Sequence, residues 1–281
     1  MDKGQVQRIL GLIDDAELVL IGASNGFDMA EGLNLFTPDD HFWQAYGDLA
    51  RRDRVRSILQ GLGSPRLAPE RRWAWQSRFA QQEYVAYDPS QLMRDLRALV
   101  GGKDVFVLTC NISGRFVKAG FDERRVLETE GSARRLVCRG CGRRWPVGQF
   151  VDAAGLRVCG DIPACPDCGG LLALDVDEAL LAHPNEETRS RLDTLAKLLA
   201  WHAGGRMVAL ELGVGLRNGV IKRMLSSSLI HERRAAYVAC NYSQALCPPG
   251  FEGRCELVQG DLSATFGQLV EEERGRCHAN R

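Results

Sequence analysis

The chain has 281 residues, of which 45% are hydrophobic and 26% charged, a composition typical of a globular protein rather than a disordered one. Its 36 Lys and Arg residues balance 36 Asp and Glu residues, which excludes a protein that binds nucleic acid through overall basic charge. The sequence has no run of about 18 apolar residues and no apolar secretory signal after Met1, so we expect a cytoplasmic protein without a membrane segment.

The first half of the chain predicts two buried strands separated by helices. The apolar segment 17–26 begins as a strand and ends in small residues, as a buried parallel strand that leads into a tight loop does. Several helices are expected over 39–100, with breaks near Gly61–Pro65 and Asp88-Pro89 and a last helix at 91–100. Strands follow at 104–109 and 126–129, and the second of these is expected at an edge.

The amino-acid composition changes from about Ala133 to Leu174, where Cys, Gly, Pro and Arg replace core residues, so we expect an insert stabilised by metal. Alternation then resumes, with helices predicted at 186–202, 219–230 and 262–273 and strands at 206–212 and 235–240. This alternation predicts an α/β fold with a Rossmann-like, doubly wound parallel sheet and an inserted small zinc-ribbon domain. The expected boundaries are 1–132 and 175–281 for the two parts of the larger domain and 133–174 for the insert.

Two Cys-x-x-Cys pairs, each followed by glycine, predict a metal site in the insert; the four residues are Cys138, Cys141, Cys165 and Cys168. Two intervening residues let both thiolates of a pair bind one ion at about 2.3 Å, and two pairs complete a tetrahedral zinc site. Four thiolates leave no position for water, so the zinc is expected to be structural. The alternative is that these cysteines are redox-active or unpaired. Cys159, between the pairs, has no evident partner.

Five arginines make the same region locally basic, namely Arg134, Arg135, Arg139, Arg143 and Arg144. We expect them to form a solvated face, and the alternatives are a surface for an acidic partner or for nucleic acid.

The loop Gly22-Ala23-Ser24-Asn25-Gly26 allows two interpretations. It matches the Gly-x-Ser-x-Gly pattern of serine hydrolases, which would make Ser24 a nucleophile. However, such a loop normally follows several strands rather than the first, and no oxyanion motif precedes it. We therefore favour a dinucleotide loop, in which small residues let backbone amides approach a pyrophosphate.

The order of these parts resembles the sirtuin family, over about residues 17–269. Sirtuins usually have Thr-Gln-Asn-Ile-Asp where this chain has Thr109-Cys110-Asn111-Ile112-Ser113, and His-Gly before the zinc module where it has Glu130-Gly131. Further segments resemble the late glycine-containing strand end, the asparagine that holds the adenosine ribose and the closing loop; these are Leu212-Gly213-Val214-Gly215, Asn241 and Gly260-Asp261. The closest resemblance is to the macrodomain-linked, or class M, sirtuins, which have also lost the histidine.

The resemblance implies a protein ADP-ribosyltransferase that uses NAD as a cosubstrate. It implies the cofactor-binding residues Gly22, Ala23, Ser24, Asn111, Gly213, Val214, Gly215, Asn241 and Asp261. For Asn111 the alternative is an ordinary strand-end asparagine, and for Asn241 it is a loop cap. The implied partners are an acceptor protein and, as in class M relatives, a lipoyl-carrier protein with a macrodomain hydrolase.

Several departures from the family pattern weaken the expectation of deacylation. The segment 32–37 lacks the Asp and Arg that sirtuins carry there, and Ser113 replaces the Asp expected to contact the carboxamide. None of the five histidines lies at the position of the base; they are His41, His183, His202, His231 and His278. Deacylation and a noncatalytic NAD-binding module are therefore kept as the alternatives.

Glu130 and Asn111 are the predicted catalytic residues. A glutamate with its ordinary pKa is a weak base near neutrality, but its carboxylate stabilises the cationic sugar that forms as nicotinamide leaves. This role suits glycosyl transfer to a protein side chain, and the alternative is that Glu130 is a solvated turn residue.

Two further groups of residues are expected to be structural rather than functional. Cys110 is predicted to be a small buried residue rather than a nucleophile. An aromatic group is predicted to lie in the core rather than to line an acceptor channel; it comprises Trp73, Trp75, Phe79, Tyr84 and Tyr87.

Overall fold

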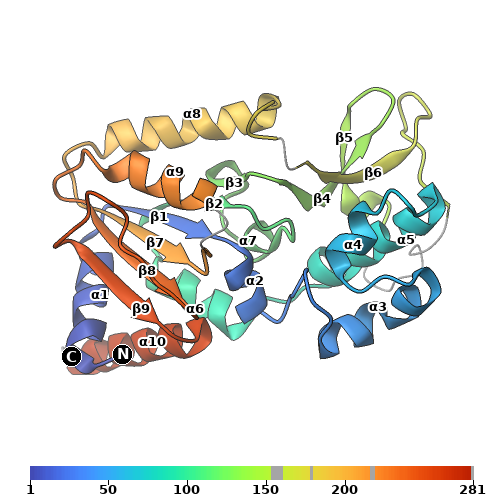
Figure 1. Ribbon diagram of the computed structural model, residues 1–281. Helices are drawn as coiled ribbons and strands as arrows, with labels where there is room; N and C mark the ends of the chain where they lie inside the picture. The colour runs from blue at the N-terminus through green and yellow to red at the C-terminus, as the bar shows by residue number, and fades with distance from the viewer. Residues whose placement is uncertain (153–160, 178–179, 216–218, 280–281) are drawn as a thin grey trace.

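A six-stranded parallel sheet forms the centre of the larger lobe in the computed structural model, which describes residues 1–152, 161–177, 180–215 and 219–279 (Figure 1). The strand order is β3-β2-β1-β7-β8-β9. The bounds are β1 Leu18–Ala23, β2 Asp104–Thr109, β3 Val126–Glu128, β7 Met207–Leu212, β8 Ala236–Asn241 and β9 Cys255–Gln259. The chain starts in the middle of the sheet and extends first to one edge and then to the other, so the predicted doubly wound fold is confirmed.

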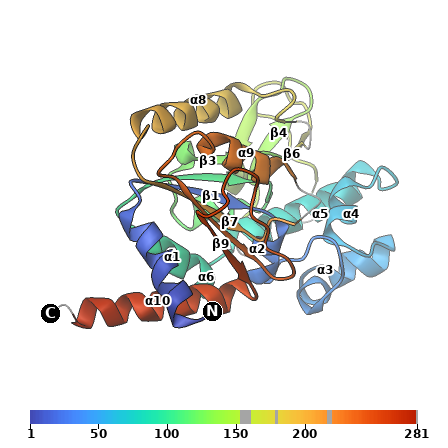
Figure 2. The ribbon, with the colours of Figure 1, turned by 60° about the vertical axis from the view of Figure 1, so that its left-hand side comes forward.

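Helices cover both faces of this sheet (Figures 1 and 2). One face carries α1 (Lys3–Asp15), α6 (Gln91–Leu99) and α10 (Leu262–Ala279), and the other carries α8 (Glu186–Trp201) and α9 (Gly219–Leu229). Strand β1 supplies alternate side chains to the two faces, Val19 and Ile21 to the first and Leu18 and Leu20 to the second. Because both faces are covered, the strand is an uninterrupted apolar run, as the sequence indicated.

The smaller lobe combines three helices with an antiparallel sheet of order β5-β4-β6. Its elements are α3 (Asp40–Asp53), α4 (Ile58–Gly63), α5 (Pro69–Ala80), β4 (Gly131–Cys138), β5 (Arg144–Pro146) and β6 (Leu172–Val176). The helices and this sheet share one core, in which Trp75 of α5 and Leu136 of β4 are fully buried. The sheet carries the four cysteines and is the predicted zinc ribbon, whereas the exact domain boundaries stay a prediction.

Polar side chains fix several helix starts. Ser90 accepts a hydrogen bond from the Met93 N–H (3.1 Å) and begins α6, which confirms the start signal predicted at Asp88-Pro89-Ser90. Asn185 begins α8 in the same way, by accepting from the Thr188 N–H (2.8 Å). The remaining short elements are α2 (Asn25–Ala30), the π-helical turn Gln81–Val85, α7 (Arg115–Lys118) and the 3-10 turns Glu123–Arg125 and Val147–Gln149.

Besides the short helices α2 and α7, helix α1 and strand β9 of the larger lobe were not predicted. Helix α1 buries Val6, Ile9, Leu10 and Ile13, a helical spacing that is visible in the sequence. Strand β9 lies at the edge of the sheet and buries only Val258, so it lacks the apolar run by which the inner strands are recognised.

Candidate active site

The loops that follow β1, β7 and β8 meet at the carboxyl edge of the parallel sheet. The Ser24 N–H donates to the Leu212 carbonyl (3.2 Å), and the Gly213 N–H donates to the Cys240 carbonyl (2.9 Å). The chain order reverses between β1 and β7, and open α/β sheets bind ligands at such a switch point. The strand-end residues predicted to bind the cofactor therefore share one edge of the sheet.

Glycines let two of these loops touch through their backbones. The Gly26 N–H donates to the Gly213 carbonyl (3.0 Å), and Gly213 has a φ of 62°. A Cβ on Gly213 would lie 2.3 Å from the Phe27 nitrogen, so only glycine fits there. Gly22 acts differently, because a Cβ there would lie 2.2 Å from Leu225 Cδ1; its small size admits helix α9 to the sheet.

The predicted residues of the second half of the sheet hold its loops together. The Asn241 Nδ2 donates to the Val214 carbonyl (2.9 Å), and Gly215, which follows, is exposed. The exposed Asp261 accepts from the Ala264 N–H (2.8 Å) and thereby caps helix α10. Asn241 and Asp261 thus have structural contacts, and a role of either toward a dinucleotide stays a prediction.

Asn111 has the strongest signature of a ligand-binding residue. Its side chain is 2% exposed, yet neither Oδ1 nor Nδ2 has a hydrogen-bond partner in the described part of the chain. The backbone around it is fixed, because the Asn111 N–H donates to Thr109 Oγ1 (3.0 Å) and the Thr129 N–H donates to the Thr109 carbonyl (2.8 Å). Buried polar atoms are normally paired, so this amide has the properties expected of a group that a ligand completes.

Glu130 lies next to the Asn111 segment, at the turn between β3 and β4. The turn is half-buried, and the Asp177 N–H donates to the Glu130 carbonyl (3.0 Å). Burial, with added repulsion from Glu130 and Asp28, raises the pKa of the Cys110 thiol to about 11. The Glu130 charge therefore acts on Cys110, and the catalytic role of Glu130 stays a prediction.

The environment of Cys110 and Ser24 disfavours nucleophilic catalysis. The Cys110 thiol stays protonated at neutral pH because of its raised pKa, and the thiolate is the reactive form. The Ser24 hydroxyl contacts the Cys110 sulfur (3.1 Å), and its described neighbours include no histidine base. Among the residues that the structure describes, the arrangement of a serine hydrolase is therefore not seen around Ser24.

Three buried carboxyl groups that we did not predict lie beside these loops: Asp28 of α2, Glu31 after it and Glu83 of the π-helical turn. Together with Arg115 of α7 they form what we call the acidic cluster. Arg115 Nη2 donates to Glu83 Oε2 (2.6 Å), and its Nη1 lies 3.9 Å from Glu31 Oε2. The Ser113 hydroxyl donates to Asp28 Oδ1 (3.3 Å). Nothing in the sequence pattern marks these acids as neighbours, because Asp28 and Glu31 belong to α2 and its C-cap, whereas Glu83 comes from the π-helical turn about fifty residues later.

The pKa values of Asp28 and Glu83 are shifted in opposite directions. Burial raises the pKa of Asp28 to about 7, although the charge of Arg115 opposes this rise. Burial also acts on Glu83, but hydrogen bonds from His41 (2.8 Å) and Tyr46 (2.7 Å) and the charge of Arg115 hold its pKa below the ordinary value. Burial thus disfavours the ionised form of Asp28, whereas the partners of Glu83 favour its ionised form.

The four predicted metal ligands come together. The sulfur atoms of Cys138, Cys141, Cys165 and Cys168 all lie within 4.8 Å of one another. Two sulfur pairs, Cys138–Cys168 at 3.4 Å and Cys141–Cys165 at 3.9 Å, are close to the separation of roughly 3.8 Å expected for a tetrahedral zinc with 2.3 Å bonds. The residues present therefore fit a structural zinc. Cys159 lies outside the described residues.

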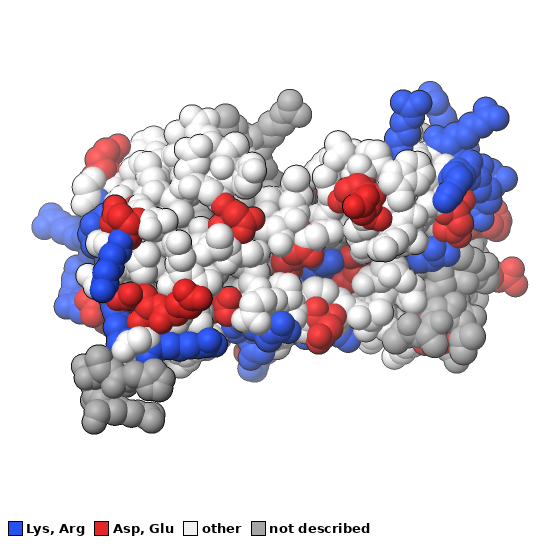
Figure 3. Space-filling model, turned by 90° about the horizontal axis from the view of Figure 1, so that it is seen from below, with Lys and Arg blue, Asp and Glu red and all other residues white. Residues whose placement is uncertain are grey.

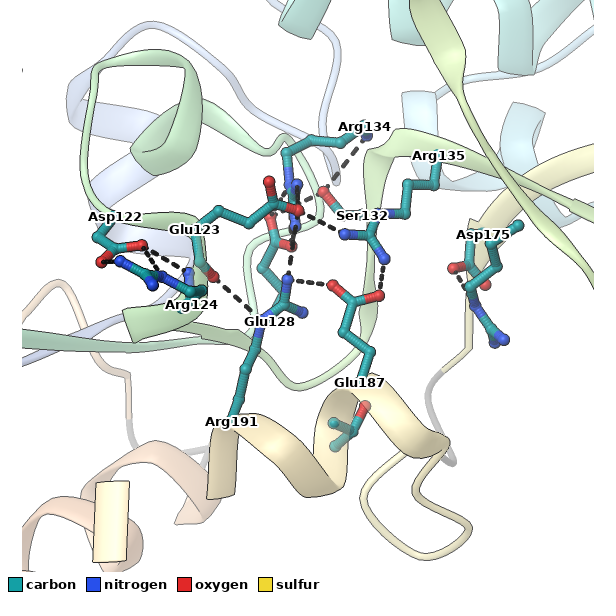
Figure 4. Close-up of polar contacts among 12 residues, drawn as sticks. Asp122, Glu123, Arg124, Glu128, Ser132, Arg134, Arg135, Asp175, Glu187 and Arg191 are labelled. Carbon is teal, nitrogen blue, oxygen red and sulfur yellow. Dashed lines mark hydrogen bonds and ion pairs between the residues drawn. The ribbon is translucent and has the colours of Figure 1, made fainter. Parts of the chain in front are cut away.

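The prediction of a solvated arginine face is wrong for two of the five arginines. Arg134 and Arg135 of β4, with Arg191 of α8, pair with carboxylates in what we call the arginine network; the acids are Glu123, Glu128 and Glu187 (Figure 4). The buried Arg134 donates to Glu128 Oε2 (2.8 Å) and Glu123 Oε1 (2.7 Å). These arginines connect the zinc ribbon to the larger lobe, a contact that no local pattern could predict.

The aromatic group is largely core, as expected. Trp73, Trp75 and Phe79 are at most 2% exposed and belong to the core of the smaller lobe. Tyr87 is partly exposed, and it donates to Glu31 (2.8 Å) and packs under the Arg115 guanidinium (4.7 Å from the ring centroid).

Figure 3 shows the charged side chains of one face. It carries both acidic and basic side chains, with basic ones gathered at its upper right, and a notch separates its two lobes. None of the helices in the described ranges is both long and apolar enough to cross a bilayer.

Comparison with known proteins gives the family. No protein-family model matches the chain. An NAD-dependent protein deacetylase of Haloarcula marismortui is 31% identical over 264 residues, which are 92% of this chain and 89% of the relative. A protein ADP-ribosyltransferase of Staphylococcus aureus is 21% identical over 272 residues, 92% and 85% of the two chains.

Solved structures agree in fold. A Sir2 homologue in complex with NAD aligns with a TM-score of 0.64 at 16% identity, over 96% of this chain and 94% of that chain. A Sir2 structure bound to a propionylated peptide aligns with a TM-score of 0.61 at 18% identity, over 95% and 98% of the two chains. The chain belongs to the sirtuin family of NAD-dependent enzymes.

Proposed function

We propose that the protein is an NAD-dependent ADP-ribosyltransferase that modifies a protein acceptor and releases nicotinamide. The observation that carries the proposal is the carboxylate of Glu130 beside the Asn111 segment, at the turn where sirtuins usually have histidine. The Staphylococcus aureus relative, which aligns with 92% of this chain, is named a protein ADP-ribosyltransferase.

The histidines in the described part of the chain are occupied elsewhere or exposed. His202 contacts Asp104 (2.8 Å), which begins β2 and so lies at the sheet edge opposite to Asn111. His41 contacts Glu83 in the acidic cluster, and His183 and His231 are exposed. Among the described residues, no histidine is therefore found beside Glu130 to deprotonate a ribose hydroxyl.

Asn111 and Glu130 would divide the work on the substrate. The free amide of Asn111 would hydrogen-bond the ribose next to the nicotinamide and fix its orientation. As the bond between the ribose and nicotinamide breaks, the ring leaves with the electron pair and positive charge develops on the sugar, which the Glu130 carboxylate would stabilise. The acceptor side chain then forms the new bond to the sugar and gives up its proton to water. The thiolate-bound zinc would hold the ribbon without taking part in this chemistry.

Lysine deacylation is the second candidate, because the 31% identical relative is named a deacetylase. Deacylation needs the proton of a ribose hydroxyl to be removed, and an ordinary glutamate accepts it poorly at neutral pH. A Glu130→His variant tests this reading directly, since it introduces the base that the turn lacks.

The test uses NAD labelled in its adenylate part, a candidate acceptor protein and an acetyl-lysine peptide. We expect label on protein and release of nicotinamide from the native chain, without acetyl-ADP-ribose. Glu130→Gln should lower the rate about 100-fold, the scale seen when one electrostatic contact to a transition state is removed. Glu130→His should gain peptide deacetylation.

The matched control is Glu70→Gln, which removes an exposed carboxylate on α5 and should leave the rate unchanged. Full activity of Glu130→Gln would exclude a catalytic carboxylate, and acetyl-ADP-ribose from the native chain would favour deacylation. Binding of NAD without turnover would favour a regulatory module, and labelling of Ser24 by a fluorophosphonate would favour a hydrolase.

A protein acceptor is supported by the fold, since Sir2 structures bind peptides. We propose a lipoyl-carrier protein as the acceptor and a macrodomain hydrolase as the enzyme that reverses the modification. Transfer of label to the lipoylated carrier, but not to the carrier without lipoate, is the expected result. Equal labelling of both forms would contradict it.

A further inference from the structure

Asp28 is a buried carboxyl group with one unfilled acceptor. Its residue is 1% exposed, and the Ser113 hydroxyl donates to Oδ1 (3.3 Å). The other oxygen, Oδ2, has no hydrogen-bond partner in the ranges that the structure describes. A buried polar atom without a partner is costly, so such an atom beside a substrate site suggests that the substrate supplies the missing donor.

The surroundings of Asp28 contain more acid than base. Glu31 and Glu83 disfavour its negative charge, whereas Arg115 favours it. Arg115 is also shared, because its Nη2 is held by Glu83 at 2.6 Å and its Nη1 lies 3.9 Å from Glu31. A ligand that brings an N–H donor or a positive charge to Oδ2 would therefore stabilise the ionised carboxylate.

Asn111 supplies the second half of this site. It lies two residues before Ser113, and its buried Oδ1 and Nδ2 are both unfilled. An ionised Asp28 carboxylate accepts hydrogen bonds but donates none, whereas an asparagine amide both donates and accepts. A substrate with a ribose hydroxyl near an N–H donor satisfies both side chains.

The sheet order indicates which end of the dinucleotide meets Asp28. NAD carries N–H donors at two places, the nicotinamide carboxamide and the adenine amino group. Asp28 and Ser113 follow β1 and β2, whereas Asn241, predicted to hold the adenosine ribose, ends β8 on the other side of β7. The adenine amino group therefore belongs to the far half of the sheet, and the carboxamide belongs near Asp28.

Resting on the proposed function, we propose that Asp28 accepts a hydrogen bond from the carboxamide N–H₂ of the nicotinamide group and thereby determines specificity for it. Ser113 is the positioning residue, because its hydroxyl holds Oδ1 and leaves Oδ2 for the substrate. The positive charge of the oxidised pyridinium ring adds to the attraction, so the acid-rich surroundings favour NAD over its reduced form.

The test compares NAD with acetylpyridine adenine dinucleotide, in which a methyl group replaces the amide N–H₂. Calorimetry gives the dissociation constant of each for the native chain, Asp28→Ala and Asp28→Asn. The native chain should bind NAD about 10- to 100-fold more tightly than the analogue, the range for a hydrogen bond to a charged group. Asp28→Ala should reduce this preference to less than about threefold, and Asp28→Asn, whose amide oxygen still accepts, should lie between.

The binding preference tests the role of Asp28 separately from the proposed ADP-ribosyl transfer. A preference for NAD that is unchanged in Asp28→Ala would overturn the role of Asp28, even if ADP-ribosyl transfer were confirmed. A lost preference would support it, even if the chain bound NAD without turnover. A native chain that binds neither dinucleotide would overturn both proposals. Glu70→Gln is the control for affinity, and the isosteric Asp28→Asn guards against misfolding of the alanine variant.

Discussion

Two buried charged clusters of the molecule differ in how their charges are paired. In the arginine network, Arg134 makes 2.7 and 2.8 Å bonds to two carboxylates, and Ser132 donates to Glu128 (2.7 Å) (Figure 4). In the acidic cluster, three carboxyl groups share one arginine, and Asp28 Oδ2 has no partner among the described residues.

The difference separates structure from function. The Arg134–Glu128 pair makes its hydrogen bonds within the protein, so it needs no ligand and orients the parts that it joins. A buried acid with an unfilled oxygen is incomplete, and its cost is tolerated where a substrate completes it. We therefore assign the arginine network to the attachment of the zinc ribbon and the acidic cluster to the substrate.

Removal of the metal should have the largest effect on stability. This effect should be confined to the zinc ribbon, which the arginine network attaches to the larger lobe. Strand β4 carries both Cys138 and Arg134, and structural zinc contributes on the order of 10 kcal/mol to small zinc-binding modules. A chelator should release about one zinc per chain and expose the amides of β4–β6 to hydrogen exchange, while β1, β2 and β7 stay protected. Full folding with less than half a zinc per chain would contradict the structural role.

Arg134→Ala should destabilise the protein by about 3–5 kcal/mol, because it leaves Glu128 buried and unpaired. Urea unfolding measures the change, and Arg139→Ala, an exposed arginine of the same ribbon, should change stability by less than about 0.5 kcal/mol. The double change Arg134→Met with Glu128→Leu should recover most of the loss. Equal stability of the two alanine variants would remove the distinction between the clusters.

Asp28→Asn should alter the pH dependence of stability. The folded pKa of Asp28 is about 7, above the ordinary 3.8, so the native state binds the proton more tightly than the unfolded state. Stability therefore falls as pH rises from about 4 to 7, by roughly 4 kcal/mol for a shift of about three pH units. The free energy of unfolding should be measured at pH 5, 6, 7 and 8. The stability of the variant relative to the native chain should rise up to pH 7. A constant difference would contradict the raised pKa.

Glu123 should respond in the opposite direction. Hydrogen bonds and charges from Arg134 and Arg135, acting against burial, lower its pKa to about 2 from 4.5. The stability that Glu123 contributes is thus present above pH 4.5 and is lost as pH falls toward 2. Glu123→Gln should reduce the loss of stability between pH 4.5 and 2, measured by unfolding at several pH values. Glu70→Gln, which removes an exposed acid on α5, is the control.

Asn111→Ala should have the smallest effect on stability, less than about 1 kcal/mol, because its side-chain atoms lose no hydrogen bond. Its NAD consumption should nevertheless fall about 100-fold. Thermal unfolding and nicotinamide release measure the two effects. A large loss of stability with unchanged activity would make Asn111 a structural residue and would remove the second half of the proposed substrate site.

The sequence alone determined those features that depend on residues close together along the chain. The apolar run before Ala23, the helix start at Ser90 and the spacing of the four cysteines each follow from a periodicity or a fixed geometry of neighbouring residues, and each is found in the structure. The sirtuin resemblance, carried by motifs in a fixed order, also agrees with the comparisons.

Only the tertiary structure decided the pairing of charges. Asp28, Glu83 and Arg115 come from separate helices, and Arg135 and its partner Glu187 are more than fifty residues apart, so no local pattern marks them as neighbours. Their burial and their partners arise when the helices close on the sheet, because a charge is stabilised by what surrounds it in space. For the same reason, the sequence suggested a solvated Arg134, whereas the fold buries it against Glu128.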